Sequence, residues 1–129
     1  MTENVQSTVT IASQKAIDEC VEFARANGVG SFPLDRRSGF RIPFVYPVRF
    51  CIGPAPTEEH TEPGHTLDMN SHGMAMCCRY GIPTGAPVWV RLPLSDGRLA
   101  WLTGTVVHCE PDAEHYRAGI AFTTQDHQP

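Results

Sequence analysis

Arginine side chains gather in one short stretch of the sequence, which holds Arg36, Arg37 and Arg41. A guanidinium group is always charged and presents its N–H donors in a planar fork, which fits two phosphate oxygens or one edge of guanine. Arg37 and Arg41 are four residues apart, and Gly39 loosens the backbone between them, so both groups can close on one anionic ligand. The same spacing also fits a solvated basic linker, and spacing alone leaves both interpretations open.

A second polar stretch, residues 68–74, joins two short predicted strands and contains Asp68, Asn70, Ser71 and Gly73. A carboxylate at Asp68 can accept from the N1–H and N2–H₂ donors of guanine, and a neighbouring amide adds a donor and an acceptor. In an extended chain Asp68 and Asn70 point to the same side, which predicts a pair of side chains that reads one base. These residue types are also the usual ones in tight turns, so ordinary turn chemistry is the alternative.

Histidines and cysteines do not indicate a metal site or covalent catalysis. His60, His65 and His72 fall near one loop, but they lack the short paired spacing of structural zinc ligands. His108 and Cys109 are adjacent, and neighbouring strand residues face opposite ways, so they form a poor base–nucleophile pair. The five cysteines include no Cys-x-x-Cys pair, which predicts reduced thiols. We therefore expect no metal, no cofactor and no catalytic residue.

The chain as a whole limits the classes of protein in which these residues can act. It has 129 residues and a net charge of −4, which fits one globular domain and argues against non-specific binding of nucleic acid. No apolar run approaches the roughly 18 residues of a transmembrane helix, and the first residues lack the basic and apolar regions of a signal peptide. The sequence thus predicts a cytoplasmic protein that neither inserts into a membrane nor binds nucleic acid.

One helix is predicted, over residues 14–27. Apolar residues recur there at three- and four-residue steps and form one stripe: Ala16, Ile17, Cys20, Val21 and Ala24. Ser13 is the expected N-cap, and Asn27-Gly28 is the expected stop. We expect the stripe to pack against the rest of the domain, with a subunit interface as the alternative.

From residue 44 onward the hydrophobic period is two, which is typical of strands. Alternating runs cover residues 44–52, 74–78, 88–94 and 116–122, and turn signals separate them. Ser95-Asp96-Gly97 predicts a tight hairpin between residues 87–94 and 98–108, and residues 110–112 predict another turn. Trp89 and Trp101 are expected in the core or on the face of a sheet. Short strands joined by tight turns predict a mainly β fold, either a barrel or a sandwich.

Together and in this order, the motifs resemble the PilZ domain family, whose members are bacterial receptors for cyclic di-GMP. The family's Arg-x-x-x-Arg element is matched by residues 37–41. Its Asp/Asn-x-Ser-x-x-Gly element is matched by residues 68–73, with Asn70 in the serine position and Ser71 one place later. Ile82-Pro83-Thr84-Gly85 and the last strand, which ends at Phe122, also match. The resemblance implies a six-stranded antiparallel β-barrel. It does not cover residues 1–30, so the predicted N-terminal amphipathic helix is an addition to that barrel.

The resemblance also implies a cyclic di-GMP site at the barrel rim, between the arginine segment and the turn at Asp68. It assigns ligand contacts to Arg36, Arg37, Arg41, Asp68, Asn70, Ser71 and Gly73. The arginines would contact phosphate and guanine, Asp68 and Asn70 would read guanine, and Gly73 would allow close backbone approach. Because asparagine is longer than serine, we expect weaker binding than a serine would give. Asn70→Ser should strengthen it unless Ser71 has taken over the role.

The expected organisation is an N-terminal extension over residues 1–30, a PilZ-like barrel domain over residues 31–126 and a tail over residues 127–129. The expected function is that of a cyclic di-GMP receptor or adaptor without enzymatic activity. An effector protein is the expected partner, and a homo-oligomer is compatible with this function. A PilZ-like protein-interaction module that no longer binds nucleotide is the alternative. A small thiol enzyme that uses Cys109 or Cys78 is a third hypothesis, with no motif behind it.

Overall fold

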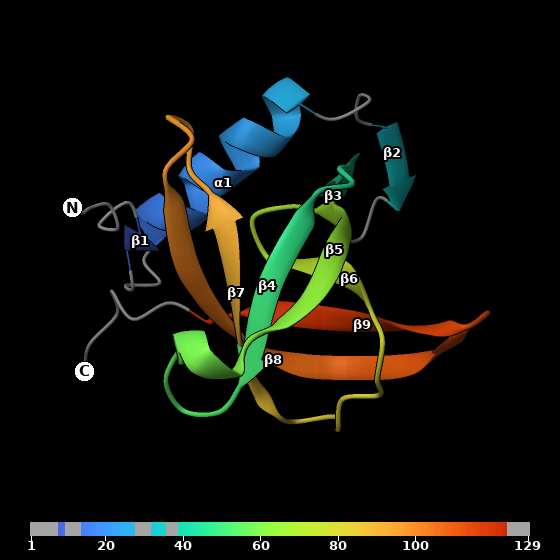
Figure 1. Ribbon diagram of the computed structural model, residues 1–129. Coiled ribbons are helices and arrows are strands. Elements are labelled where there is room, and N and C mark those ends of the chain that lie inside the picture. The colour runs from blue at the N-terminus through green and yellow to red at the C-terminus, as the bar shows by residue number, and fades with distance from the viewer. Residues whose placement is uncertain (1–7, 10–13, 28–31, 36–38, 124–129) are drawn as a thin grey trace, which may run out of the picture.

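The computed structural model describes the backbone of residues 8–9, 14–27, 32–35 and 39–123, and the side chains of residues 14–27 and 42–123. Strands dominate these ranges (Figure 1). The elements in chain order are β1 (Thr8–Val9), α1 (Gln14–Asn27), β2 (Phe32–Asp35), β3 (Gly39–Pro43), β4 (Pro47–Ile52), the 3-10 helix η2 (Glu58–His60), β5 (Glu62–Met69), β6 (Gly73–Cys78), β7 (Pro87–Pro93), β8 (Leu99–Asp112) and β9 (His115–Phe122). Of the helices described, none has the length and apolar character needed to cross a membrane.

Six strands close into an antiparallel barrel. In the order β5–β4–β7–β8–β9–β6 each strand pairs with the next, and β6 pairs back with β5. Closure gives every one of these strands two neighbours and so protects their edges. Outside the barrel, β3 pairs with β5 and with β2, while β1 runs parallel to β8. The predicted mainly β fold, with a six-stranded antiparallel barrel and an N-terminal helix, is confirmed.

Alternating strand residues fill the barrel interior, as the period of two predicts. The buried side chains of β4, β6 and β7 include Val48, Phe50, Met74, Met76, Val88, Val90 and Leu92. Removing this apolar surface from water is the main stabilising contribution to such a fold. β4 begins at Pro47, so residues 44–46 of the predicted run precede the strand, although Phe44 is still buried.

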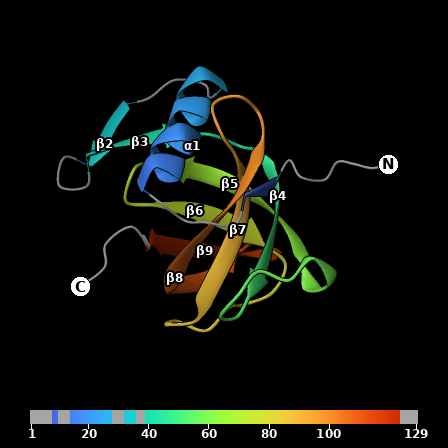
Figure 2. The ribbon, with the colours of Figure 1, turned by 90° about the vertical axis from the view of Figure 1, so that its left-hand side faces the viewer.

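α1 lies over one end of the barrel (Figure 1, Figure 2). It spans the predicted residues 14–27, and its buried side chains are the five of the predicted stripe. They belong to the same hydrophobic core as the barrel strands, so the stripe packs against the domain itself. Phe23 adds edge-on contacts to Phe44 and Tyr46, with ring centroids 5.9 and 5.6 Å away. Ser13 and Gly28, the expected cap and stop, lie outside the described residues.

Both tryptophans lie on the outer face of the barrel and are nonetheless buried. Trp89 and Trp101 alternate with the inward-facing residues of β7 and β8 and form a separate cluster with Cys51. The guanidinium of Arg91 lies 5.3 Å from the ring centroid of Trp101. The backbone N–H of Thr57 donates to Sγ of Cys51 at 3.4 Å. The β4–β5 connection therefore covers this cluster.

The two hairpins that include β8 differ in how well local turn residues predicted them. At residues 95–97 the turn is confirmed, because β7 and β8 pair on both sides of it and Gly97 has a φ of 90°. The turn predicted at residues 110–112 is wrong. Pro111 lies opposite Tyr116 and Asp112 opposite His115, so β8 continues and the turn follows, with φ of 58° at Ala113. The pairing register of the long hairpin decides where this strand ends, and local turn propensity does not.

Candidate functional site

The arginine segment and the turn after Asp68 come from separate parts of the chain and lie on neighbouring strands. β3 pairs antiparallel with the end of β5, with Ile42 opposite Met69 and Pro43 opposite Asp68. Arg41 precedes Ile42 on β3, so its backbone lies just beyond the last residue pair, Ile42 and Met69. Arg36 and Arg37 lie outside the described residues. The structure thus places Arg41 on the strand that pairs with β5, two residues from the position opposite Asp68.

Asp68 has a cationic neighbour that sequence reasoning missed. Its side chain is 15% exposed, and its Oδ2 lies 3.7 Å from Nη2 of Arg117. Arg117 belongs to β9, and only the pairing of β6 with both β5 and β9 brings it near Asp68. The pair sets an acceptor and a cation side by side, a combination that can bind a guanine edge and a phosphate.

Small residues form the surface beside Asp68. Asp68 lies opposite Ala75 on β6, Ala75 lies opposite Gly119 on β9, and Gly119 lies opposite His108 on β8. A Cβ at Gly119 would lie 2.3 Å from Nε2 of His108, so the imidazole packs against the glycine backbone. The row has a carboxylate at one end and an imidazole ring at the other, with two small buried residues between them. Neither Ala75 nor His108 was predicted, because only the register aligns them with Asp68.

Asn70 is engaged in the turn itself. It is 8% exposed, and its Oδ1 accepts hydrogen bonds from the backbone N–H groups of His72 at 2.8 Å and Gly73 at 3.1 Å. A side-chain oxygen that replaces a backbone acceptor in this way is typical of tight turns. β5 ends at Met69, so the argument from an extended chain does not apply to Asn70. These hydrogen bonds are the ones expected if Asn70 stabilises a tight turn, which was the alternative to reading a base.

Gly73 begins β6 at a point where this strand closely approaches β9. A Cβ at Gly73 would lie 2.2 Å from the carbonyl oxygen of Ile120. No side chain fits there without a shift of one of the two backbones. The close backbone approach expected at Gly73 is present, and the partner in the structure is a neighbouring strand.

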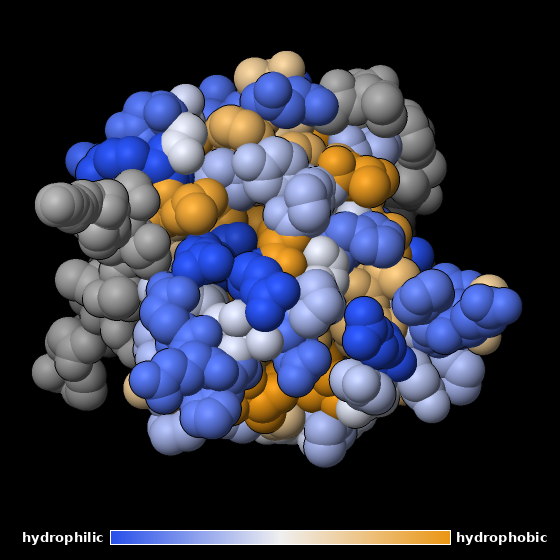
Figure 3. Space-filling model, in the orientation of Figure 1, coloured by the Kyte–Doolittle hydropathy of each residue, from blue (hydrophilic) through white to orange (hydrophobic). Residues whose placement is uncertain are grey.

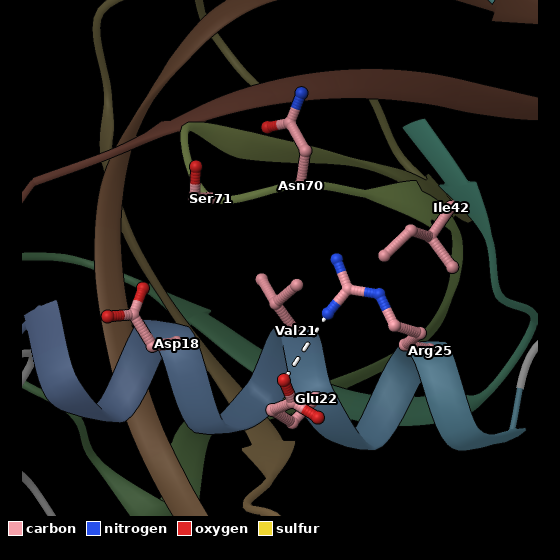
Figure 4. Close-up of a pocket in the computed structure, with 7 residues that line it drawn as sticks. All are labelled: Asp18, Val21, Glu22, Arg25, Ile42, Asn70 and Ser71. Carbon is pink, nitrogen blue, oxygen red and sulfur yellow. Dashed lines mark hydrogen bonds and ion pairs between the residues drawn. The ribbon is translucent and has the colours of Figure 1, made fainter. Parts of the chain in front are cut away.

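A pocket of about 320 Å³ separates α1 from the turn (Figure 4). Figure 4 shows the helix side chains on one side of this pocket and Asn70 and Ser71 on the other. Ser71 is exposed. Asp18 and Glu22 come from the helix, and Arg25, the one cation among the described lining residues, lies 3.4 Å from Glu22. Carboxylates outnumber cations among the described lining residues, which makes this side of the turn unfavourable for a phosphate.

Comparison with known proteins identifies the family. A family model described as the PilZ domain matches residues 35–129. The chain belongs to the PilZ domain family. It is also similar to the crystal structure of the PilZ domain of CeSA from a cellulose-synthesizing bacterium, with 22% identity, 67% of this chain and 82% of that chain covered, and a TM-score of 0.49. A search of curated proteins found no match. PilZ domains are generally cyclic di-GMP-binding modules and not enzymes.

The cysteines of this PilZ domain do not favour the thiol-enzyme hypothesis at Cys78. Burial, and to a lesser extent the neighbouring thiols of Cys109 and Cys77, raise the pKa of Cys78 to about 11. Because the thiolate is the nucleophilic form, Cys78 is a poor nucleophile at neutral pH. Cys109 accepts a hydrogen bond from the backbone N–H of Ile82 at 3.4 Å. Among the described residues, no group of three His, Cys, Asp or Glu could hold a metal ion.

Removing the Asn70 side chain should destabilise the fold. We expect Asn70→Ala to lower the free energy of unfolding by about 1–2 kcal/mol, because two backbone N–H groups lose their acceptor. Asn70→Asp is the matched variant and should retain more stability, since it keeps an oxygen at that place. Urea unfolding followed by tryptophan fluorescence measures both. An alanine variant that unfolds at the parent's urea concentration would show that these hydrogen bonds do not stabilise the domain.

Proposed function

We propose that this PilZ domain binds cyclic di-GMP on the outer face of the barrel, where β3, β5, β6 and β9 adjoin. The observation that carries the proposal is the pairing of β3 with β5, which sets Arg41 on the strand beside Asp68. Two motifs separated in sequence thereby meet at one edge, as a composite ligand site requires. The family supports the nature of the ligand, since PilZ domains are generally cyclic di-GMP-binding modules.

The arginines are the proposed phosphate contacts. Cyclic di-GMP is a dianion, and the protein has a net charge of −4, so binding depends on a local excess of cations. Arg37 and Arg41 can each make two parallel hydrogen bonds to phosphate oxygens or to a guanine edge, and Arg36 adds a further cation. Of the three, Arg41 lies on β3.

Asp68 is the proposed reader of guanine. Its carboxylate can accept from N1–H and N2–H₂ of the base, and Arg117 helps to hold it in place through their ion pair. Asn70 and Gly73 would then act through the turn that follows Asp68. Ser71, exposed at the turn, is the proposed direct contact from that motif.

The proposed biological role is that of a cytoplasmic receptor in bacterial second-messenger signalling. With no catalytic residue in the proposed site, the output must be a change in what the domain presents to an effector protein. In this role the nucleotide controls the contact with the effector protein. A homo-oligomer is compatible with it.

Calorimetric titration with cyclic di-GMP, with GTP as the control nucleotide, tests the proposal. We expect saturable binding of cyclic di-GMP alone, weakened about tenfold in Asp68→Ala by the loss of a charge-assisted hydrogen bond. If Asp68 reads the base and does not support the turn, the same variant should unfold near the parent's urea midpoint. A parent protein that binds neither nucleotide contradicts the proposal. A variant that loses stability and keeps its affinity assigns Asp68 to the fold.

Neutralising the acidic face of α1 should strengthen nucleotide binding. Asp18 and Glu22 line the pocket beside the turn and repel a dianion. We expect Asp18→Asn combined with Glu22→Gln to raise the affinity for cyclic di-GMP about threefold at low salt, an effect that salt should screen. Glu59→Gln, which removes an exposed carboxylate from η2, is the matched control. Titrations at low and high salt measure the effect, and equal low-salt affinities would exclude an electrostatic influence of α1.

A protein-interaction module without nucleotide binding is the second candidate. The observation that favours it is Asn70, which replaces the family's serine and whose amide oxygen already accepts from two backbone N–H groups. The receptor proposal instead expects binding to survive, with Asn70→Ser gaining up to about tenfold in affinity. If neither the parent nor Asn70→Ser releases heat with cyclic di-GMP, the interaction module is the better account.

A further inference from the structure

Two pockets adjoin on the outer face of the barrel, and we call them together the β5 groove. The larger has a volume of about 330 Å³ and the smaller about 160 Å³, and Pro63 and Gly64 of β5 line both. The larger pocket extends over β4 toward β7 and β8, and the smaller one over β6 and the start of β9. Because Pro63 and Gly64 line both, the two pockets lie side by side across β5.

Two arginines face each other in the larger pocket. Arg49 of β4 lies directly opposite Arg91 of β7 in the strand register. Like charges in this position destabilise a strand pair. Arg91 is neutralised, because its Nη1 lies 2.7 and 3.0 Å from the two carboxylate oxygens of Glu58. Arg49 instead donates from Nε and Nη2 to the hydroxyl and carbonyl oxygens of Thr61, both at 3.0 Å.

Arg49 is therefore held in place without being neutralised. In the part of the chain that the structure describes, no carboxylate lies within ion-pair distance of Arg49, and its Nη1 has no hydrogen-bond partner. The contacts to Thr61 limit the conformations of the guanidinium before any ligand arrives. A cation fixed in this way loses little entropy when it binds an anion.

The smaller pocket also contains a cation. Arg79, His65 and His115 line it, and Arg79 is exposed with no carboxylate partner among the described residues. No carboxylate lines either pocket within the described chain, although the protein as a whole is acidic. Figure 3 shows strongly hydrophilic residues in the middle of the face over β4 and β7, next to hydrophobic ones. The groove concentrates positive charge on a negative protein.

The spacing of the two unpaired arginines indicates the size of the ligand. Arg49 lies opposite Pro63 on one side of β5, and Cys78, which precedes Arg79, lies opposite Gly64 on the other side. The two arginines therefore flank β5 at about two strand spacings, or about 10 Å. A single carboxylate or phosphate cannot reach both. An extended peptide rises about 3.3 Å per residue and its side chains alternate between two faces, so carboxylates two or four residues apart share a face and, at about 7 or 13 Å, bracket this separation.

We propose that the β5 groove docks an extended acidic segment of a partner protein. Carboxylates of that segment bind Arg49 and Arg79. An apolar side chain beside them enters the larger pocket, where Tyr46, Pro47 and Leu99 provide apolar walls. None of the proposed nucleotide contacts lines the groove, although Cys77 of the smaller pocket pairs with Arg117, the neighbour of Asp68. The groove would give the domain a surface for recognising an effector.

Fluorescence anisotropy tests the proposal with a labelled peptide in which a leucine is followed by a run of glutamates. The control peptide carries glutamine in place of every glutamate. We expect the acidic peptide to bind and the glutamine peptide not to bind, and high salt to weaken the binding. Arg49→Gln combined with Arg79→Gln should weaken binding at least about tenfold. Arg25→Gln combined with Lys15→Gln, which removes two positive charges from α1, should leave it within about twofold.

Several results would overturn the proposal. They are no binding of the acidic peptide, equal binding of both peptides, or an equal loss in the double variant at Arg49 and Arg79 and in the α1 control variant. Competition by cyclic di-GMP at the groove would assign these arginines to the nucleotide, and tighter binding of a single-stranded oligonucleotide would indicate a general polyanion surface. Sedimentation of the protein alone is the last test. If the parent protein self-associates and the double variant at Arg49 and Arg79 does not, a second copy of the chain occupies the β5 groove.

Discussion

Gly73→Ala is expected to lower the free energy of unfolding by about 2–3 kcal/mol, the usual cost of forcing a methyl group into a filled core. The new Cβ would lie 2.2 Å from the carbonyl oxygen of Ile120, and the strain falls on two backbones, which cannot rotate away as a side chain can. Urea unfolding with tryptophan fluorescence measures the loss. β6 pairs with both β5 and β9, so a shift of β6 would also disturb barrel closure.

Gly81→Ala is the matched control for this prediction. Its Cβ would meet an atom of the Tyr116 side chain at 3.3 Å, and that ring can move by a few tenths of an ångström. We expect Gly81→Ala to change the stability by less than about 1 kcal/mol. If Gly73→Ala keeps the parent's stability and instead loses cyclic di-GMP binding, the motif glycine serves the ligand and not the strand contact.

Sequence reasoning succeeded where a local signal and the three-dimensional constraint agree. The stripe of α1 has one apolar face, and a helix of that length must bury it, so residues 14–27 were predicted with their buried side chains. The hairpin at residues 95–97 was predicted because Gly97 accepts a positive φ. At Ala113 the local signal was misleading, since the β8–β9 register extends the strand past Pro111 and moves the turn.

The candidate site was harder to predict, because its residues meet only through strand pairing. Asp68 was predicted from its type and its motif, whereas Arg117 lies beside it only because β6 separates β5 from β9. Asn70 was identified from the motif, but the direction of its side chain was not. The sequence placed it on the face of Asp68 by assuming an extended chain, and the strand ends one residue before it. Motif spacing therefore indicated which segments matter, and the register decides what each side chain in them can do.

The charge distribution connects the two proposals made for this domain. Arg41, a proposed contact of the nucleotide, lies on β3 and further cations line the β5 groove, while the carboxylates of Asp18 and Glu22 line the pocket at α1. At a net charge of −4 the protein repels polyanions at long range, so anions can bind only where several guanidinium groups act together. Removing one such group should therefore weaken binding much more than removing an arginine elsewhere.

Arg41→Ala is expected to weaken cyclic di-GMP binding by about 1.5–3 kcal/mol, which corresponds to roughly tenfold to a hundredfold in Kd. Arg41 is the arginine of the segment whose backbone the structure sets beside Asp68, and a guanidinium there can make paired hydrogen bonds to phosphate. Arg41→Lys should recover only part of the loss, because an ammonium keeps the charge and lacks the fork. Calorimetric titration measures all three proteins.

Arg98→Gln is the matched control for Arg41, since it removes one positive charge from the β7–β8 hairpin, where Arg98 pairs with Asp96 at 2.8 Å. Its effect on cyclic di-GMP binding should stay within about twofold, the scale of an exposed charge. A loss in Arg41→Ala no larger than this would reduce Arg41 to a general electrostatic contribution. A full recovery by Arg41→Lys would show that charge alone matters, and the contact between a guanidinium fork and phosphate would have to be abandoned even though the nucleotide binds.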